Sequence, residues 1–187
     1  KLFTNSRETV YITGGKQGSH VINEAIFKIL PDLFERFNVI HQCGSTTLFN
    51  DIQKAEQIKC SLGKISENYI VKEYFFDSEI GSVFNTADFV ISRAGAHTVY
   101  ELMVLNKPAI LIPIPWSNKA EQIENAKMLV SLGLAEILSQ EDLEKGKLLQ
   151  TIFDFEKNLT KYRLSSDTII GLNASEIIVE EIEKILK

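Results

Sequence analysis

The sequence is poor in cysteine and proline and has no long apolar run. Its two cysteines, Cys43 and Cys60, exclude a disulfide framework and favour a reducing compartment. Neither the cysteines nor the three histidines show a metal-ligand spacing, so the sequence predicts no metal site. With 4 prolines and 10 glycines among 187 residues, a collagen-like repeat is excluded. No stretch approaches the ~20 apolar residues that a membrane-spanning helix needs, and no segment typical of a signal peptide opens the chain.

Basic residues are outnumbered by acidic ones, 20 against 25, which gives a net charge of -5. An acidic chain disfavours broad binding to nucleic acid or to anionic membranes. Hydrophobic residues make up 44% of the sequence and charged residues 24%, as in an ordinary globular domain. A chain of this length buries a full core as one domain, and we expect a single domain over residues 1–187.

Short apolar segments alternate with stretches of helical periodicity along most of the chain. Strands are predicted at residues 10–13, 38–42, 69–71, 88–92, 108–113 and 135–138, and helices at 21–37, 48–58, 78–86, 98–105, 120–132 and in most of the segment after 140. This alternation indicates βαβ units, and the nearly all-apolar strands indicate a sheet that is covered on both faces. The sequence therefore predicts an α/β fold with a Rossmann-like, doubly wound parallel sheet. The tail 173–187 is amphipathic and packs on this domain or on another one.

Ligands of an open parallel sheet bind at the carboxyl ends of its strands, so the segments after the strands are candidate sites. After the first strand, residues 14–20 bring three glycines and Lys16 to the start of a helix. Such a loop favours a phosphate through its backbone N–H groups and the helix dipole. Neither the dinucleotide fingerprint nor the P-loop spacing is present. A phosphate site and a plain strand-to-helix turn both remain open at this loop.

Two further loops place polar groups at the same edge. Residues 92–98 precede Glu101, whose carboxylate suits the vicinal hydroxyls of a ribose; an acid that complements the helix dipole is the alternative. After the fifth strand, Glu121, Gln122 and Asn125 lie within about one helical turn and suit the hydroxyls of a sugar. No nucleophile-elbow sequence stands out. Together the three loops indicate a pocket for a nucleotide that carries a second polar group.

These loops resemble the C-terminal half of the MurG family, bacterial transferases that add N-acetylglucosamine to a lipid-linked muramyl-pentapeptide in peptidoglycan synthesis. The resemblance extends over residues 8–150, and the tail 151–187 matches only in its helical character. It is carried by residues 14–19 with Asn23, 41–44, 87–88, 92–101, Pro108 and 121–126. It implies that the chain is one half of a GT-B glycosyltransferase fold, the domain that binds UDP-N-acetylglucosamine. The N-terminal acceptor domain of the family is expected to be absent.

The resemblance also implies roles for single residues. The loop 15–18 faces the diphosphate, residues 96–98 lie near the phosphates and the sugar, and Glu101 holds the ribose hydroxyls. The N-acetylglucosamine contacts residues 121–122, and the uracil stacks near residues 75–77. The implied donor-binding set is Gly15, Lys16, Gln17, Gly18, Phe76, Arg93, Gly95, Ala96, His97, Thr98, Glu101, Glu121, Gln122 and Asn125.

The implied activity is an inverting transfer that needs no metal and no cofactor, with its catalytic base in the acceptor domain. The chain alone is therefore expected to be soluble and inactive, and the full enzyme to be peripheral at the cytoplasmic face of the plasma membrane. Two positions depart from the family, which usually has Ser at the position of Lys16 and Gln at that of Glu121. These departures leave the choice of sugar open.

Three alternatives remain beside this interpretation. The chain is a separate UDP-sugar-binding subunit that acts only with an acceptor-domain partner, as in the split N-acetylglucosaminyltransferase of the dolichol pathway, with the tail as its docking helix. An enzyme similar to UDP-N-acetylglucosamine 2-epimerase shares the fold, but its acid–base residues are not placed in this sequence. An NAD-dependent enzyme is disfavoured by the glycine spacing.

Overall fold

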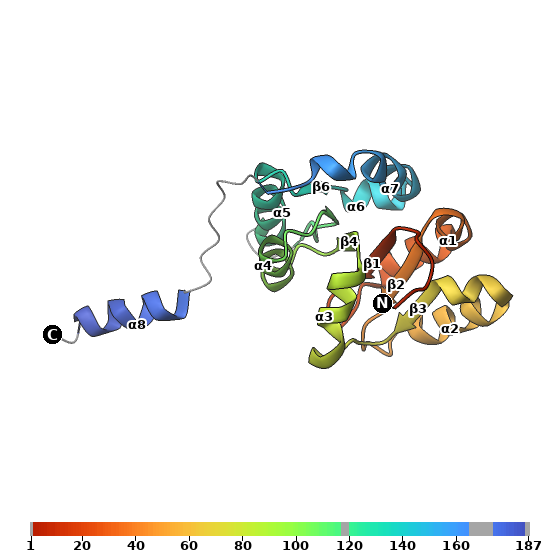
Figure 1. Ribbon diagram of the computed structural model, residues 1–187, viewed down its shortest axis with the longest axis horizontal. Helices are drawn as coiled ribbons and strands as arrows, with labels where there is room; N and C mark the ends of the chain where they lie inside the picture. The colour runs from red at the N-terminus through yellow and green to blue at the C-terminus, as the bar shows by residue number, and fades with distance from the viewer. Residues whose placement is uncertain (1, 117–119, 165–173, 186–187) are drawn as a thin grey trace.

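The structure is a computed structural model that describes residues 2–116, 120–164 and 174–185 (Figure 1). Strands and helices alternate from the first strand to the sixth, as predicted. The elements are β1 (Thr9–Thr13), α1 (His20–Arg36), β2 (Asn38–Gln42), α2 (Asp51–Ser61), the 3₁₀ helix η1 (Gly63–Asn68), β3 (Tyr69–Lys72), α3 (Asp77–Thr86), β4 (Phe89–Ser92), α4 (Ala96–Val104), β5 (Ala109–Leu111), α5 (Glu121–Ser131), β6 (Ala135–Ile137), α6 (Gln140–Glu144), α7 (Leu148–Lys157), the 3₁₀ helix η3 (Leu159–Lys161) and α8 (Ala174–Ile185).

The six strands form one sheet in the order β3-β2-β1-β4-β5-β6, and every neighbouring pair is parallel. Successive strands run outward from β1 to β3, and the chain then returns to the middle and continues from β4 to β6. This is the doubly wound Rossmann order, and it confirms the predicted fold class. The order reverses between β1 and β4, where Thr13 pairs with Ser92 at the carboxyl ends of the two strands.

Helices cover both faces of the sheet, and each face has its own core. Alternate residues of a strand point to opposite faces, so Val10 and Ile12 of β1 pack with α1, α6 and α7, whereas Tyr11 packs with α3, α4 and α5. Figure 1 shows these two groups of helices on opposite sides of the strands. Because both faces are buried, the strands read as continuous apolar runs instead of alternating ones.

Among the boundaries that differ from the sequence prediction, two have a cause in the backbone. The second helix begins at Asp51 and not at residue 48, because Asn50 has a left-handed backbone with φ of 53° that does not belong to a right-handed helix. The helical stretch after residue 140 is divided into α6 and α7, with Gly146 in a left-handed conformation between them. Both differences arise from single residues that leave the helical region, which apolar periodicity does not report.

The predicted helical tail is present as α8, while residues 165–173 and 186–187 lie outside the described part of the chain. Its apolar side chains are 48% to 83% exposed: Ile177, Ile178, Val179, Ile182 and Ile185. None of the helices in the described ranges has the length and apolar character that crossing a bilayer requires.

Candidate functional site

The loop between β1 and α1 fits against the loop after β2 through its backbone. The N–H of Ser45 donates to the carbonyl of Lys16 at 3.0 Å, and Gly18 donates to Gly15 at 3.1 Å. A Cβ on Gly18 would lie 2.0 Å from the carbonyl oxygen of Cys43, and the φ of Gly18 is +85°. Glycine is therefore required here by both space and conformation. The loop places Lys16 and Gln17 at the surface, as their exposure shows.

The side chain of Gln42 joins the β1–α1 loop to the loop after β3. The sequence alone assigned this residue no role. Its Nε2 donates to the carbonyl of Gly15 and to Oγ1 of Thr13, both at 3.1 Å. Its Oε1 accepts from the N–H of Phe75 at 3.0 Å. A buried amide that satisfies two loops at once fixes their relative position. The only available signal was its place as the last residue of a predicted strand.

Two helix N-termini meet at the reversal between β1 and β4. Helix α1 has Ser19 and helix α4 has Gly95 as N-cap, and neither helix has a side chain that caps its N–H groups. Neither helix has an acidic residue in its first turn. The first N–H groups of a helix lack partners within it and carry a partial positive charge. We call this carboxyl edge of the sheet at the strand reversal the crevice, because ligands of doubly wound sheets bind there. It offers two such helix starts to an anion, with Ala96, His97 and Thr98 in the first turn of α4.

Arg93 follows β4 at this edge of the sheet, and its guanidinium is hydrogen-bonded to other residues of the chain. Its guanidinium donates to Oγ of Ser19 at 3.2 Å, to the carbonyl of Ile112 at 3.1 Å and to Oε1 of Gln140 at 3.1 Å. The residue is only 9% exposed. These contacts join the start of α1 to the end of β5 and to the start of α6, so the geometry of Arg93 fits a positioning role. A direct contact with substrate stays a prediction.

Glu101 lies one turn into α4 and is exposed at the surface. Partial burial of its carboxyl raises its pKa, and His97, one turn earlier on the same face, partly offsets that rise. Among the described residues, this carboxylate forms no cap and no ion pair with another side chain. Its oxygens are exposed and can accept hydrogen bonds, and the ribose-binding role of Glu101 stays a prediction.

The start of α5 combines two bonded amides and one exposed acid. Oε1 of Gln122 accepts from the N–H of Ile114 at 3.1 Å, and Nδ2 of Asn125 donates to the carbonyl of Ala94 at 3.1 Å. Glu121 is exposed. Asn125 thus ties α5 to the loop after β4, so the two polar loops predicted from the sequence do meet. Residues 117–119 of the intervening loop lie outside the described residues.

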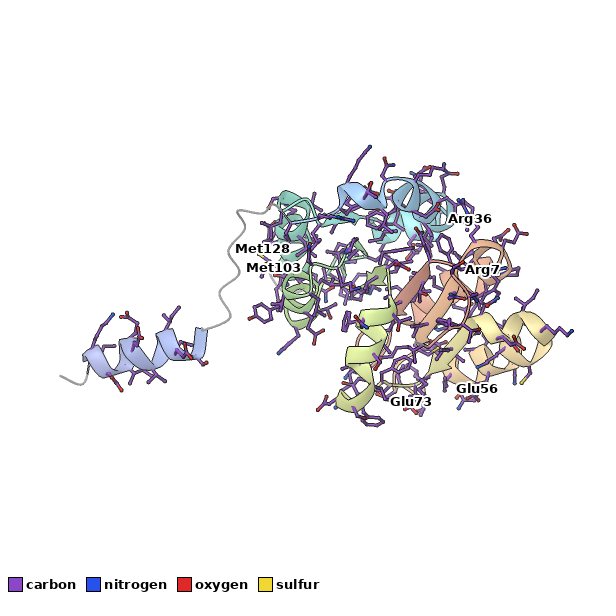
Figure 2. The ribbon with its side chains drawn as sticks, in the orientation of Figure 1. Arg7, Arg36, Glu56, Glu73, Met103 and Met128 are labelled. Atoms are coloured by element: carbon purple, nitrogen blue, oxygen red, sulfur yellow. The ribbon has the colours of Figure 1, made fainter. Side chains whose placement is uncertain are left out.

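A cavity of about 490 Å³ opens beside β3 and brings two predicted residues together, Lys16 and Phe76. Figure 2 labels Glu56 and Glu73, which line it from α2 and from the loop after β3. The ring of Phe76 is 66% exposed and meets Tyr74 edge to face at 5.3 Å. Phe75, in contrast, packs its ring against Tyr11 and is 4% exposed. Of the two aromatic residues predicted near the uracil, Phe76 is the one with an accessible face.

The comparisons with known proteins bear on the family and the fold of the chain. The family described as "Glycosyltransferase family 28 C-terminal domain" matches residues 9–180. A relative from Clostridium perfringens, named UDP-N-acetylglucosamine–N-acetylmuramyl-(pentapeptide) pyrophosphoryl-undecaprenol N-acetylglucosamine transferase, is 35% identical over 86% of this chain and 42% of its own length. A Clostridium botulinum protein of the same name is 33% identical over 99% of this chain and 49% of its own length.

The crystal structure of MurG from Acinetobacter baumannii has the same fold over this domain. It superposes with a TM-score of 0.73 and 25% sequence identity, and covers 96% of this chain and 52% of that one. The chain thus spans about half the length of the curated relatives that it matches.

Proposed function

The chain belongs to the C-terminal domains of glycosyltransferase family 28, and on that premise we propose that it is the donor domain of a UDP-N-acetylglucosamine transferase of peptidoglycan synthesis. The acceptor in this proposal is the lipid-linked muramyl-pentapeptide, which a further domain binds at the cytoplasmic face of the plasma membrane. The names of the relatives support both the sugar and the acceptor.

The observation that carries the proposal is the pair of uncapped helix starts at the strand reversal. Two partial positive charges of this kind suit a diphosphate, which carries its charge on two neighbouring phosphoryl groups. In the proposed pose the loop 15–18 and residues 95–98 hold the diphosphate between them. Arg93 supports the loop from beneath by its bond to Ser19.

The remaining predicted residues extend the pose in two directions. Glu101 accepts from the ribose hydroxyls, and the exposed face of Phe76 lies against the uracil in the cavity that Lys16 also lines. On the other side, Glu121 and Gln122 are near the N-acetylglucosamine, and Asn125 keeps α5 against the loop after β4. The domain extends over residues 1–187 in this proposal, with the core at 8–150.

In the proposed reaction, the acceptor hydroxyl oxygen forms a bond to the anomeric carbon while the bond from that carbon to the diphosphate oxygen breaks. The hydroxyl proton passes to a base outside this chain, and UDP leaves with the bonding electron pair. The negative charge that develops on UDP is stabilised by the N–H groups of α1 and α4. A preorganised donor of this kind contributes about 10²- to 10³-fold to the rate.

A second candidate is a separate donor-binding chain that works with an acceptor-domain partner. The observation that favours it is α8, whose five apolar side chains are at least 48% exposed. Coexpression with an acceptor domain, followed by copurification of the two chains, distinguishes this candidate from a two-domain polypeptide.

Calorimetric titration of the chain with UDP-N-acetylglucosamine, UDP-glucose, UDP and NAD tests the proposal. We expect saturable binding of UDP and of both UDP-sugars, tightest for UDP-N-acetylglucosamine, and no heat of binding for NAD. Equal affinity for the two sugars would assign sugar choice to another part of the enzyme and contradict the role of Glu121. Binding of NAD alone, or no binding of UDP, would overturn the donor-domain proposal.

A further inference from the structure

A group of three metal-ligand side chains lies where α1 approaches α2, next to the start of α1 that the proposed donor site uses. His20 and Glu24 are one turn apart on α1, and Asp51 is the first residue of α2. One nitrogen or oxygen of each residue lies within 4.8 Å of those of the other two. The sequence predicted no metal site because Asp51 is 31 positions from His20, and only the fold brings them together.

The carboxylate of Asp51 is the fixed member of this group. It is 2% exposed, and its Oδ1 lies 2.8 Å from Nδ1 of His20. Its Oδ2 accepts from Nδ2 of Asn23 at 2.7 Å. A buried carboxylate needs such partners, and here one of its two oxygens is held by an amide while the other faces the imidazole.

Asn23 is itself hydrogen-bonded to buried residues, and these hydrogen bonds fix the orientation of the Asp51 carboxylate through Asn23. Nδ2 of Asn23 also donates to the carbonyl of Cys43 at 2.9 Å, which leaves its Oδ1 to accept from Nε2 of His41 at 3.0 Å. Burial lowers the pKa of His41 to about 3, so its ring is neutral. Its Nδ1 therefore accepts from the hydroxyl of Tyr69 at 2.9 Å. Hydrogen-bonded carboxylates with such outer partners are typical of metal sites.

The other two members are partly exposed and adjustable. The side chain of His20 is 33% exposed and that of Glu24 is 30% exposed, and the imidazole stacks on Phe49 at 3.9 Å. A tetrahedral ion with bonds of about 2.0 Å has its ligand atoms roughly 3.3 Å apart. Nδ1 of His20 and Oδ1 of Asp51 are 2.8 Å apart, and all three ligand atoms lie within 4.8 Å of one another, so small changes in side-chain position bring them to this spacing.

Space for further ligands lies next to the group. A cavity of about 330 Å³ between α1 and the α6–α7 segment is lined by His20, Glu24, Lys28 and Glu144 among others. It is large enough for water molecules to complete a coordination shell. The positive charge that now neutralises Glu24 is the ammonium of Lys54, 2.5 Å from Oε1.

We propose that His20, Glu24 and Asp51 form a binding site for a divalent transition-metal ion, with Zn²⁺ as the principal candidate. One imidazole nitrogen with two carboxylate oxygens suits zinc, whereas Mg²⁺ and Ca²⁺ take oxygen ligands. The ion takes the place of the proton shared by His20 and Asp51 and of the ammonium of Lys54. This proposal does not rest on the proposed donor function, since none of the three side chains belongs to the predicted donor-binding set. The two sites are neighbours, because His20 is the first residue of α1, whose backbone N–H groups the proposed donor site uses.

The test is a titration of the Cys60→Ser chain with Zn²⁺ by calorimetry and with Co²⁺ by visible absorption. The serine variant is used because Cys60 is an exposed thiol that binds these ions by itself. We expect one ion per chain, and His20→Ala is expected to weaken binding at least about tenfold, since even outer partners of metal ligands contribute about 10- to 100-fold. Glu24→Gln is expected to weaken it in the same direction. Lys54→Ala is expected to tighten binding, because it removes the competing cation.

Asp32→Asn, an exposed change on the same helix, is the matched control and is expected to leave the affinity unchanged. Thermal unfolding of each variant without metal verifies that it is folded. Absence of Zn²⁺ binding, unchanged binding in His20→Ala, weaker binding in Lys54→Ala, or equal affinity for Mg²⁺ would each overturn the site.

Discussion

The two sides of the crevice differ in the kind of group that forms them: mainly backbone on one side and exposed side chains on the other. On the side of β1, β2 and β3, the loops are joined by backbone hydrogen bonds, by the contact of Gly18 with Gly44 and by the buried amide of Gln42. On the side of α4 and α5, the polar groups are exposed side chains such as His97, Glu101 and Glu121. We therefore expect the loops of the first side to be held in one conformation by their backbone contacts. The side chains of the second side are exposed, and we expect them to adjust to a ligand.

This difference predicts where substitutions act. A change on the first side alters the shape of the loops and therefore the stability of the domain. A change on the second side alters only the groups that a ligand meets. Lys16 and Glu121, where the sequence analysis expects departures from the family, are both exposed side chains and not loop-forming glycines.

Gly18→Ala is the substitution with the largest expected effect. A Cβ there would lie 2.0 Å from the carbonyl oxygen of Cys43, and φ is +85°, so two backbone segments must move apart. We expect the free energy of unfolding to fall by about 4 kcal/mol or more, measured by urea denaturation.

The matched control is Gly95→Ala on the other side of the crevice. A Cβ on Gly95 meets no atom within 4 Å, and its φ is -67°. We expect a change within about 1 kcal/mol, since alanine is a somewhat poorer N-cap than glycine. Equal destabilisation by the two substitutions would show that the two sides do not differ in this way.

Arg93→Met is expected to have the next largest effect. The change removes three hydrogen bonds and leaves the carbonyl of Ile112 and the amide of Gln140 without a donor in a buried position. We expect a loss of about 3 kcal/mol in the free energy of unfolding. Arg36→Met is the control, because the ion pair of Arg36 with Glu156 lies nearer the surface and contributes about 1 kcal/mol or less. A variant of Arg93 that keeps full stability but loses UDP affinity would indicate a direct ligand contact instead.

The sequence was a good guide to the fold because the fold depends on local patterns. Six apolar segments separated by helical stretches suffice to predict a parallel sheet covered on both faces. All six strands begin within one residue of their predicted starts. The loops at the carboxyl ends follow from the same pattern. The positive φ at Asn50 does not, because a single left-handed residue leaves the apolar periodicity unchanged.

The sequence was a weaker guide to what each polar residue contacts. Nothing local distinguishes Arg93, which is bonded inside the protein, from an arginine that faces a ligand. Gln42 and Asp51 gained their roles from partners about 30 positions away along the chain. Such contacts depend on the order of strands in the sheet, which the alternation of elements alone does not specify.

Glu101→Ala tests the adjustable side and is expected to act on binding alone. Loss of hydrogen bonds to a charged carboxylate is expected to weaken UDP binding by about 1–3 kcal/mol, measured by calorimetry, with the stability nearly unchanged. Glu124→Ala on α5, whose carboxylate is exposed and paired with Lys127, is the control with unchanged affinity.

Because burial raises the pKa of Glu101, UDP binding is expected to weaken on acidification at a higher pH than an ordinary glutamate would give. An unchanged dissociation constant for UDP would remove the ribose assignment.

Glu8→Gln probes the opposite, amino edge of the sheet, where we expect a small effect on stability and none on UDP binding. Burial of Glu8, with the nearby carboxylates of Glu156 and Asp88, raises its pKa in the folded chain, and its Oε2 is buried without a hydrogen-bond partner. A raised folded pKa means that the contribution of the protonated carboxyl to stability is complete below the unfolded pKa and is lost as the pH rises through the folded one. Glutamine cannot ionise, so the variant is expected to melt at a higher temperature than the original chain at pH 7, with the difference vanishing in acid. Glu35→Gln, an exposed change on α1, is expected to show no such pH-dependent gain. A gain in melting temperature that grows on acidification would contradict this sign, and a change in UDP affinity would mean that the two edges of the sheet are coupled.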